Sequence, residues 1–168
     1  MKRKMDFVLK NDEGFYKDIF RFYPRSTYVH SFNDNPPKNW NEVYKVYYSW
    51  VILRQYDDGC YIKTEKLFNL SYDECSAVPN LSKIIKYVIK TKEDFVVRGT
   101  GQPSGNWYIY YKTYYSLDGD TDYLEFHVFN SFTNQGYKFI LTIDECNKFC
   151  EYLDRINDYA LKFRGKGI

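Results

Sequence analysis

Alternating apolar and polar positions dominate the middle of the chain and predict antiparallel strands. The segment Val43–Tyr56 is dense in Val, Ile, Tyr and Trp, and we expect its even positions to form one continuous apolar face: Tyr44, Val46, Tyr48, Trp50 and Ile52. The other face carries Lys45, Tyr47, Ser49 and Gln55. Asp57-Asp58-Gly59 is typical of a hairpin turn, so Cys60–Lys63 and Leu67–Leu70 are predicted to return as strands.

A second group of strands follows in the other half of the chain. Turn-forming residues at 99–106, at 117–122 and at Asn134-Gln135-Gly136 separate four runs of strand-forming residues. The predicted strands are Phe95–Arg98, Trp107–Ser116, Tyr123–Phe129 and Tyr137–Leu141.

Helical periodicity appears in three places. Asn11 is a suitable cap for a helix over Asn11–Tyr23, whose rings fall on one face before Pro24 ends it, and a long loop is expected over Pro24–Asn41. A helical region from Ser71 to about Lys90 is interrupted by Pro79, which predicts a short first turn and a helix capped again at Asn80. The last helix is predicted over Thr142–Phe163, with a buried stripe made of Phe149, Tyr152, Leu153, Ile156, Tyr159, Ala160 and Phe163.

The two strand-to-helix junctions resemble each other. Leu70-Ser71-Tyr72-Asp73-Glu74-Cys75 aligns with Leu141-Thr142-Ile143-Asp144-Glu145-Cys146, and both contain the Ser/Thr-x-x-Glu pattern of a capping box. An internal duplication explains this match, and so does independent convergence on the same cap. The sequence leaves both explanations open.

Several antiparallel strands followed by a capped helix, twice in one chain, resemble the Whirly family and its coactivator-type relatives. The resemblance covers roughly residues 43 to 163 and lies in the order of the elements. Members of that family bind single-stranded DNA across sheet surfaces, so the resemblance implies a sheet-based nucleic-acid binder.

We therefore predict a single α+β domain over residues 1–168, a curved antiparallel sheet with helices packed on one side. Its expected parts are an N-terminal helix and long loop (1–41), two strand-then-helix halves that are possible relatives of each other (42–92 and 93–163), and a basic tail (164–168).

Composition narrows the choice of partner. The chain has 19 Tyr, 13 Phe and 3 Trp among 168 residues, a density of rings that suits base stacking and protein interfaces alike. Its 24 basic and 22 acidic side chains leave a net charge of +2, which argues against a strongly basic duplex binder. No apolar run is long enough to cross a membrane and the start lacks an apolar signal core, so the expected location is cytoplasmic.

Candidate chemistry is sparse. Cys60, Cys75, Cys146 and Cys150 lack the spacing of a zinc site, and we expect reduced thiols and no metal or other cofactor. The loop Gly99–Gly105 has the glycine density of a phosphate cradle but is read as a hairpin loop, and Asp118–Asp122 as a turn in preference to a calcium site. His127 beside Glu125 is interpreted as a surface or edge histidine, so we expect no enzymatic activity.

The function predicted from these patterns is non-catalytic binding of single-stranded nucleic acid through an aromatic and basic sheet face. The alternative is a small phage or mobile-element inhibitor or adaptor that uses the same rings against a host protein, for example a nuclease complex. For either function the candidate contact residues are Lys45, Tyr47, Arg98, Tyr108, Tyr110 and Lys112.

Overall fold

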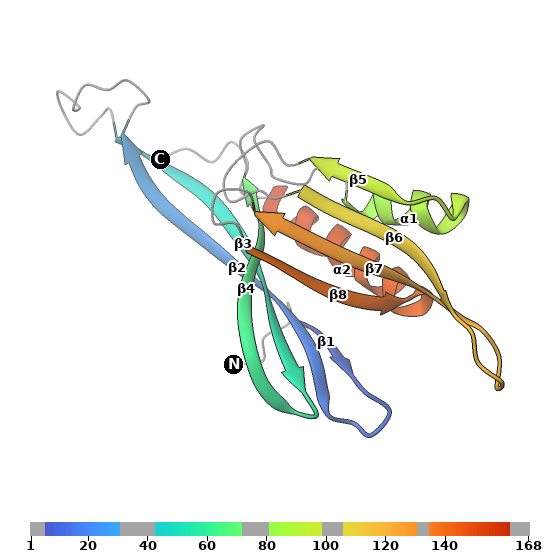
Figure 1. Ribbon diagram of the computed structural model, residues 1–168. Helices are drawn as coiled ribbons and strands as arrows, with labels where there is room; N and C mark the ends of the chain where they lie inside the picture. Colours follow the sequence, from blue (N-terminus) through green and yellow to red (C-terminus); the bar gives the residue numbers. More distant parts are fainter. Residues whose placement is uncertain (1–5, 31–42, 72–80, 99–105, 131–134, 162–168) are drawn as a thin grey trace.

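The described part of the chain folds into two four-stranded antiparallel sheets and two helices, which confirms the predicted α+β class (Figure 1). The computed structural model describes residues 6–30, 43–71, 81–98, 106–130 and 135–161. The first sheet has the order β1-β2-β3-β4, with bounds Asp6–Lys10, Tyr16–His30, Val43–Asp57 and Cys60–Ser71. The second sheet has the order β5-β6-β7-β8, with bounds Phe95–Arg98, Asn106–Tyr114, Thr121–Asn130 and Gln135–Thr142. The helices are α1 (Leu81–Thr91) and α2 (Ile143–Leu161).

The predicted N-terminal helix is wrong. Residues 11–23 contain the turn between β1 and β2 and the first part of β2. The loop expected over Pro24–Asn41 is wrong up to His30, where β2 ends, and its remainder lies outside the described residues. Strand β2 pairs with β3 without a break from Asp18↔Gln55 to His30↔Val43. The spacing of the aromatic residues and Ile19 suggested a helical face. From Tyr16 onward these side chains belong to a strand, which is stabilised by pairing with the distant segment β3.

The core-facing side of β3 also differs from the prediction. Val51 and Leu53 are fully buried, so the odd positions of this part of the strand face the core, while Ile52 is half-buried. Because side chains alternate between the two faces of a strand, a one-residue difference in phase exchanges the faces. The turn after β3 is as predicted, with Asp58 and Gly59 at φ +46° and +82°.

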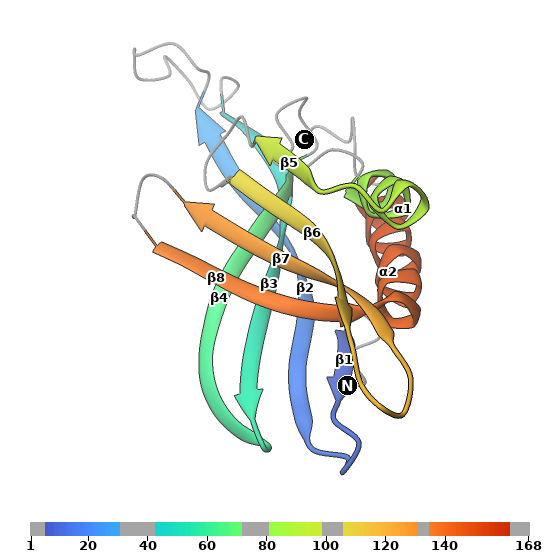
Figure 2. The ribbon, with the colours of Figure 1, turned by 45° about the vertical axis from the view of Figure 1, so that its right-hand side comes forward.

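The other strands lie close to their predicted positions. Strand β5 coincides with the predicted Phe95–Arg98, and β6, β7 and β8 differ from their predictions by a few residues at their ends. The two strands predicted over Cys60–Leu70 form one continuous strand, β4. Both α1 and α2 cover the same face of the second sheet, and neither of them covers its other face (Figures 1 and 2).

The core is an aromatic cluster to which both sheets and α2 contribute. The rings of Phe126 and Phe139 stack with centroids 4.6 Å apart and an interplanar angle of 8°. Phe20 of the first sheet lies 5.2 Å from Phe139 and 4.8 Å from Phe149 of α2. Much of the aromatic content of the chain therefore stabilises the contact between the two sheets and the helix.

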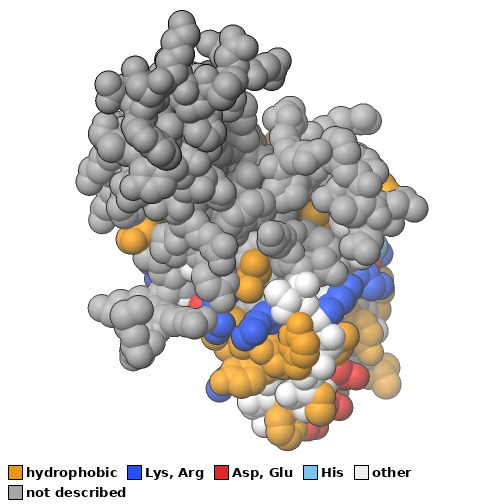
Figure 3. Space-filling model, turned by 90° about the vertical axis from the view of Figure 1, so that its left-hand side faces the viewer, with side chains coloured by type: hydrophobic (Ala, Val, Ile, Leu, Met, Phe, Trp, Pro, Cys, Tyr) orange, Lys and Arg blue, Asp and Glu red, His pale blue; other side chains and the backbone are white. Residues whose placement is uncertain are grey.

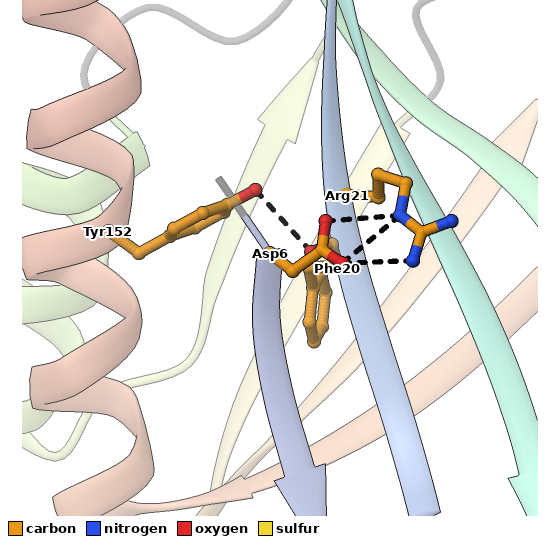
Figure 4. Close-up of polar contacts among 4 residues, drawn as sticks. All are labelled: Asp6, Phe20, Arg21 and Tyr152. Atoms are coloured by element: carbon orange, nitrogen blue, oxygen red, sulfur yellow. Dashed lines mark hydrogen bonds and ion pairs between the residues drawn. The ribbon is translucent and has the colours of Figure 1, made fainter. Parts of the chain in front are cut away.

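Polar contacts attach the N-terminal strands to this core (Figure 4). The Arg21 guanidinium donates to both carboxylate oxygens of Asp6, with Nε–Oδ1 and Nη2–Oδ2 distances of 3.0 and 2.9 Å, and so joins β1 to β2. The buried Tyr152 hydroxyl of α2 donates to the carbonyl oxygen of Phe20 at 3.5 Å. Burial raises the pKa of Tyr152 above its ordinary value.

The predicted capping box at Thr142 is confirmed. The Glu145 amide donates to Thr142 Oγ1 at 3.2 Å, and the Thr142 amide donates to Glu145 Oε1 at 2.9 Å. Ser71, the counterpart of Thr142, is the last residue of β4, and the rest of the first predicted box lies outside the described residues. Helix α1 begins at Leu81, in agreement with the predicted second start after Asn80.

We expect Thr142→Ala to lower the free energy of unfolding by about 1 kcal/mol, because the variant loses the hydroxyl acceptor of the first helical turn. Chemical denaturation of the two proteins measures the difference. Thr142→Ser keeps an oxygen at the same place and should retain most of the stability. Equal losses in both variants would show that the cap is not the cause.

Candidate functional site

The face of the second sheet that the helices leave uncovered carries a groove. It is lined by residues of β6, β7 and β8 and has a volume of about 500 Å³. Its lining residues are Tyr108, Tyr110, His127, Val128, Phe129, Gly136 and Lys138. We call this surface the groove.

Strand register explains why these residues meet. Tyr108 lies opposite His127, which in turn lies opposite Lys138, and Phe129 lies opposite Gly136. Alternation along β6 directs Trp107 and Ile109 into the core and leaves Tyr108 and Tyr110 on the other face, where both are half-buried. Gly136 has no side chain, and a Cβ there would lie 3.5 Å from the Phe129 ring.

Charged groups lie at one end of the groove. Glu125 is 8% exposed, and its two carboxylate oxygens contact His127 Nε2 at 2.5 Å and Lys112 Nζ at 3.0 Å. Burial alone would raise the pKa of Glu125, but hydrogen bonds from His127 and Lys112 bring this pKa below its ordinary value. The same contact with Glu125 raises the pKa of Lys112. Glu125 is therefore a carboxylate whose negative charge is balanced by its neighbours.

Rings surround these charges. The Tyr110 and His127 rings meet edge to face, with centroids 5.2 Å apart, and Lys112 Nζ lies 5.7 Å from the centroid of the Tyr110 ring. Lys138 projects from the neighbouring strand, and its backbone oxygen accepts a hydrogen bond of 2.9 Å from Gln55 Nε2 of the first sheet. The groove thus combines π faces with a lysine that has an exposed side chain.

The structure brings together three of the six residues that the sequence predicted for the site. Tyr108 and Tyr110 line the groove, and Lys112 lies beside it on the same face of β6. Lys45 and Tyr47 belong to β3 in the other sheet, where they pair with Tyr28 and Ser26, and Arg98 ends β5 opposite Asn106. The side chains of Lys45, Tyr47 and Arg98 lie outside the described residues.

Sequence reasoning left five lining residues of the groove out of the predicted site: His127, Val128, Phe129, Gly136 and Lys138. These residues reach the groove through the pairing of β7 with β8, which the Asn134-Gln135-Gly136 turn signal predicts only as a hairpin. Alternation in β8 was the available signal, because Phe139 and Leu141 are buried while Lys138 and Ile140 are exposed.

The acidic turn between β6 and β7 is held by the chain's own groups. Asp122 accepts hydrogen bonds from the hydroxyls of Tyr111 and Thr113 at 2.6 and 2.7 Å. The contact with Asp122 raises the pKa of Tyr111 to about 12 and lowers that of Asp122. Gly119, at φ +122°, closes the turn with Ser116. These contacts support the interpretation as a plain turn.

Three of the four cysteines can be placed. Cys60 is exposed, whereas Cys146 and Cys150 are buried in contact with the backbone oxygens of Leu141 and Ser82, and all three are free thiols. Burial raises the pKa of both buried thiols, which keeps them protonated and unreactive. Cys75 and the glycine-rich loop at 99–105 lie outside the described residues. Within the described ranges, no group of three or more His, Cys, Asp or Glu side chains is placed to hold a metal ion.

The comparisons with known proteins return few matches. A scan against protein-family models finds no match, and a search of curated proteins finds none either. Among solved structures, the chain is similar to the plant transcriptional regulator PBF-2 with a TM-score of 0.41 and 14% sequence identity. That similarity covers 97% of this chain and 93% of the plant chain. In the part of this chain that the structure describes, no helix is long and apolar enough to cross a membrane.

Proposed function

We propose that the chain is a non-catalytic binding protein that holds single-stranded nucleic acid in the groove. The observation that carries the proposal is the grouping of Tyr108, Tyr110, His127 and Phe129 around one groove together with Lys138. Unpaired bases stack on aromatic rings whatever their sequence, and a lysine beside the rings neutralises a phosphate. A duplex hides the faces of its bases, so the groove favours a single strand.

The charges of the groove predict only a modest dependence on salt. Lys112 is paired with Glu125 at 3.0 Å, so its charge is partly compensated, whereas the exposed side chain of Lys138 lines the groove itself. Lys138 is therefore a better candidate than Lys112 for a phosphate contact.

Titration of the full chain with fluorescently labelled oligo-dT, at about 50 and about 200 mM salt, tests the proposal. We expect Tyr108→Ala and Tyr110→Ala each to cost about 1–3 kcal/mol of binding free energy, which is a loss of about 5- to 150-fold in affinity. The slope of log affinity against log salt concentration counts the phosphates that the protein neutralises. Lys138→Ala should reduce this slope by about the value for one phosphate, and Lys112→Ala should reduce it by less. These two lysine variants separate a phosphate contact from a structural ion pair.

Tyr61→Ala is the matched control, because Tyr61 is a 59% exposed ring of the first sheet that does not line the groove. It should leave the affinity for oligo-dT unchanged. Absence of binding at about 50 mM salt, where ionic contacts are strongest, would contradict the proposal.

A second candidate function, an adaptor that binds a protein, is supported by different residues. Large apolar side chains are exposed near two of the turns: Tyr61 and Ile62 after the turn between β3 and β4, and Tyr114, Tyr115 and Leu117 at the turn between β6 and β7. Exposed rings are typical anchors of protein interfaces. A phage or mobile-element origin and a host target stay predictions.

A further inference from the structure

An aromatic surface lies at the end of the first sheet where two of its turns meet. It consists of Phe15, Tyr16, Tyr56, Tyr61 and Ile62, and we call it the tip surface. Phe15, Tyr61 and Ile62 are 47%, 59% and 56% exposed. Figure 3 shows hydrophobic side chains gathered at this lower end of the molecule, with Lys and Arg side chains above them.

Ring contacts connect the three tyrosines of the tip surface, and Phe15 lies against the turn after β3. A Cβ at Gly59 would lie 3.3 Å from Phe15 Cδ1, so the turn after β1 packs against the turn after β3. The Tyr56 ring lies 5.7 Å from that of Tyr16 and 5.9 Å from that of Tyr61. Three tyrosines from three different strands thus form a chain of rings that reaches solvent.

The first of the two turns holds its shape through its own hydrogen bonds. Asn11 Oδ1 accepts hydrogen bonds from the amides of Glu13 and Phe15 at 3.1 and 2.9 Å, and the Asn11 amide donates to the Phe15 oxygen at 2.9 Å. Gly14, at φ +87°, adopts a left-handed conformation that suits glycine. Because these turns are already ordered, a partner would bind without a large loss of chain entropy.

Charge indicates the chemistry of the partner. Both turns carry exposed carboxylates next to the rings, namely Asp12, Glu13, Asp57 and Asp58. Lys10 Nζ lies 5.3 Å from the centroid of the Tyr16 ring, so a cation of the chain itself lies against one ring of the tip surface. Carboxylates repel the phosphates of nucleic acid and attract Arg and Lys.

We propose that the tip surface docks a segment of a partner protein in which Arg or Lys alternates with apolar side chains. The apolar side chains contact Phe15 and Ile62, and the cations contact the tyrosine rings and the turn carboxylates. This inference names a partner class for the adaptor function, and it does not depend on nucleic-acid binding in the groove.

The test uses a fluorescein-labelled peptide of ten residues with alternating Arg and Leu. A peptide of the same length with alternating Glu and Leu keeps the apolar side chains without the cations. A peptide with alternating Arg and Ser keeps the cations without the apolar side chains. We expect the full chain to bind the Arg-Leu peptide at least tenfold more tightly than either of the other two.

Two double variants identify the surface. Tyr61→Ser with Ile62→Ser, and Asp57→Asn with Asp58→Asn, should each weaken binding of the Arg-Leu peptide at least tenfold. The matched control is Tyr87→Ser with Val96→Ser, because these side chains are also about half exposed but belong to α1 and β5 and to none of the turns that carry exposed rings. The control should bind the peptide like the unchanged protein, and thermal unfolding verifies that each variant is folded.

Three results would overturn the inference. Binding of the Glu-Leu peptide as tight as that of the Arg-Leu peptide would exclude recognition of cations. An equal loss in the control variant would show unspecific adhesion to exposed apolar side chains. Loss of oligo-dT binding or of self-association in the Tyr61/Ile62 variant, without loss of peptide binding, would assign the tip surface to nucleic acid or to a second copy of the chain. Failure of oligo-dT binding alone would contradict only the proposal for the groove.

Discussion

Replacing Phe139 by alanine should lower the free energy of unfolding by about 3–5 kcal/mol. Phe139 is 3% exposed and contacts rings from both sheets and from α2: Phe20, Trp107, Phe126 and Phe149. Truncation leaves a cavity at the point where the three elements meet, and neighbours held by several ring contacts cannot readily fill it.

Urea denaturation monitored by fluorescence measures this loss. Phe129→Ala is the control, because Phe129 is 37% exposed in the paired strand β7, and its loss should cost less than about 1 kcal/mol. Phe139→Leu keeps most of the apolar volume and should be intermediate. If Phe129→Ala and Phe139→Ala were equally destabilising, the aromatic cluster would not be the main support of the fold.

Asp18→Asn should stabilise the protein at neutral pH and not at acidic pH. Asp18 is 4% exposed on β2, and burial raises its pKa to about 6. The nearby charge of Lys17 and a hydrogen bond with Gln55 act against this rise in pKa, and the charge of Glu145 adds to it. The folded state therefore holds the proton of Asp18 more tightly than the unfolded chain, in which the carboxyl group has its ordinary pKa of 3.8.

This difference sets the direction of the pH effect. The contribution of Asp18 to stability is fully present below about pH 4 and is lost as the pH rises through about 6. A pKa difference of about 2 corresponds to a cost on the order of 3 kcal/mol above pH 7, which the neutral amide of asparagine does not carry.

Denaturation of both proteins at pH 4 and pH 7.5 tests this prediction. The stability gained by Asp18→Asn should be larger at pH 7.5 than at pH 4 by an amount on the order of 3 kcal/mol. Glu13→Gln removes an exposed carboxylate from the neighbouring turn and should show little change between the two conditions. A gain in stability for Asp18→Asn that does not vary with pH would mean that burial does not raise the pKa of this carboxyl group.

Local patterns in the sequence were sufficient for several elements. The hairpin turn at Asp58-Gly59, the strand β5 and the cap at Thr142 were predicted correctly, because each depends on residues adjacent in the chain. Tyr108, Tyr110 and Lys112 could likewise be placed on one face of a strand, because side chains two residues apart point the same way.

The tertiary structure decided the elements whose partners are distant. The spacing of Phe15, Tyr16, Ile19, Phe20 and Tyr23 fits a helical face, yet residues from Tyr16 onward form β2. Its residues 18–23 pair with residues of β3 that are 27 to 37 positions away in the chain. Strand hydrogen bonds join separate segments, so a local pattern does not reveal the partner that makes a strand favourable over a helix.

The candidate site shows the same division. The sequence determined that β6 presents two tyrosines and a lysine on one side. The register of β6, β7 and β8 decided that His127, Phe129 and Lys138 lie beside them, and that Lys112 is paired with Glu125. The packing of the two sheets against α2 decided which rings entered the core and which stayed at the surface, because burial depends on what the fold places above each face of a strand.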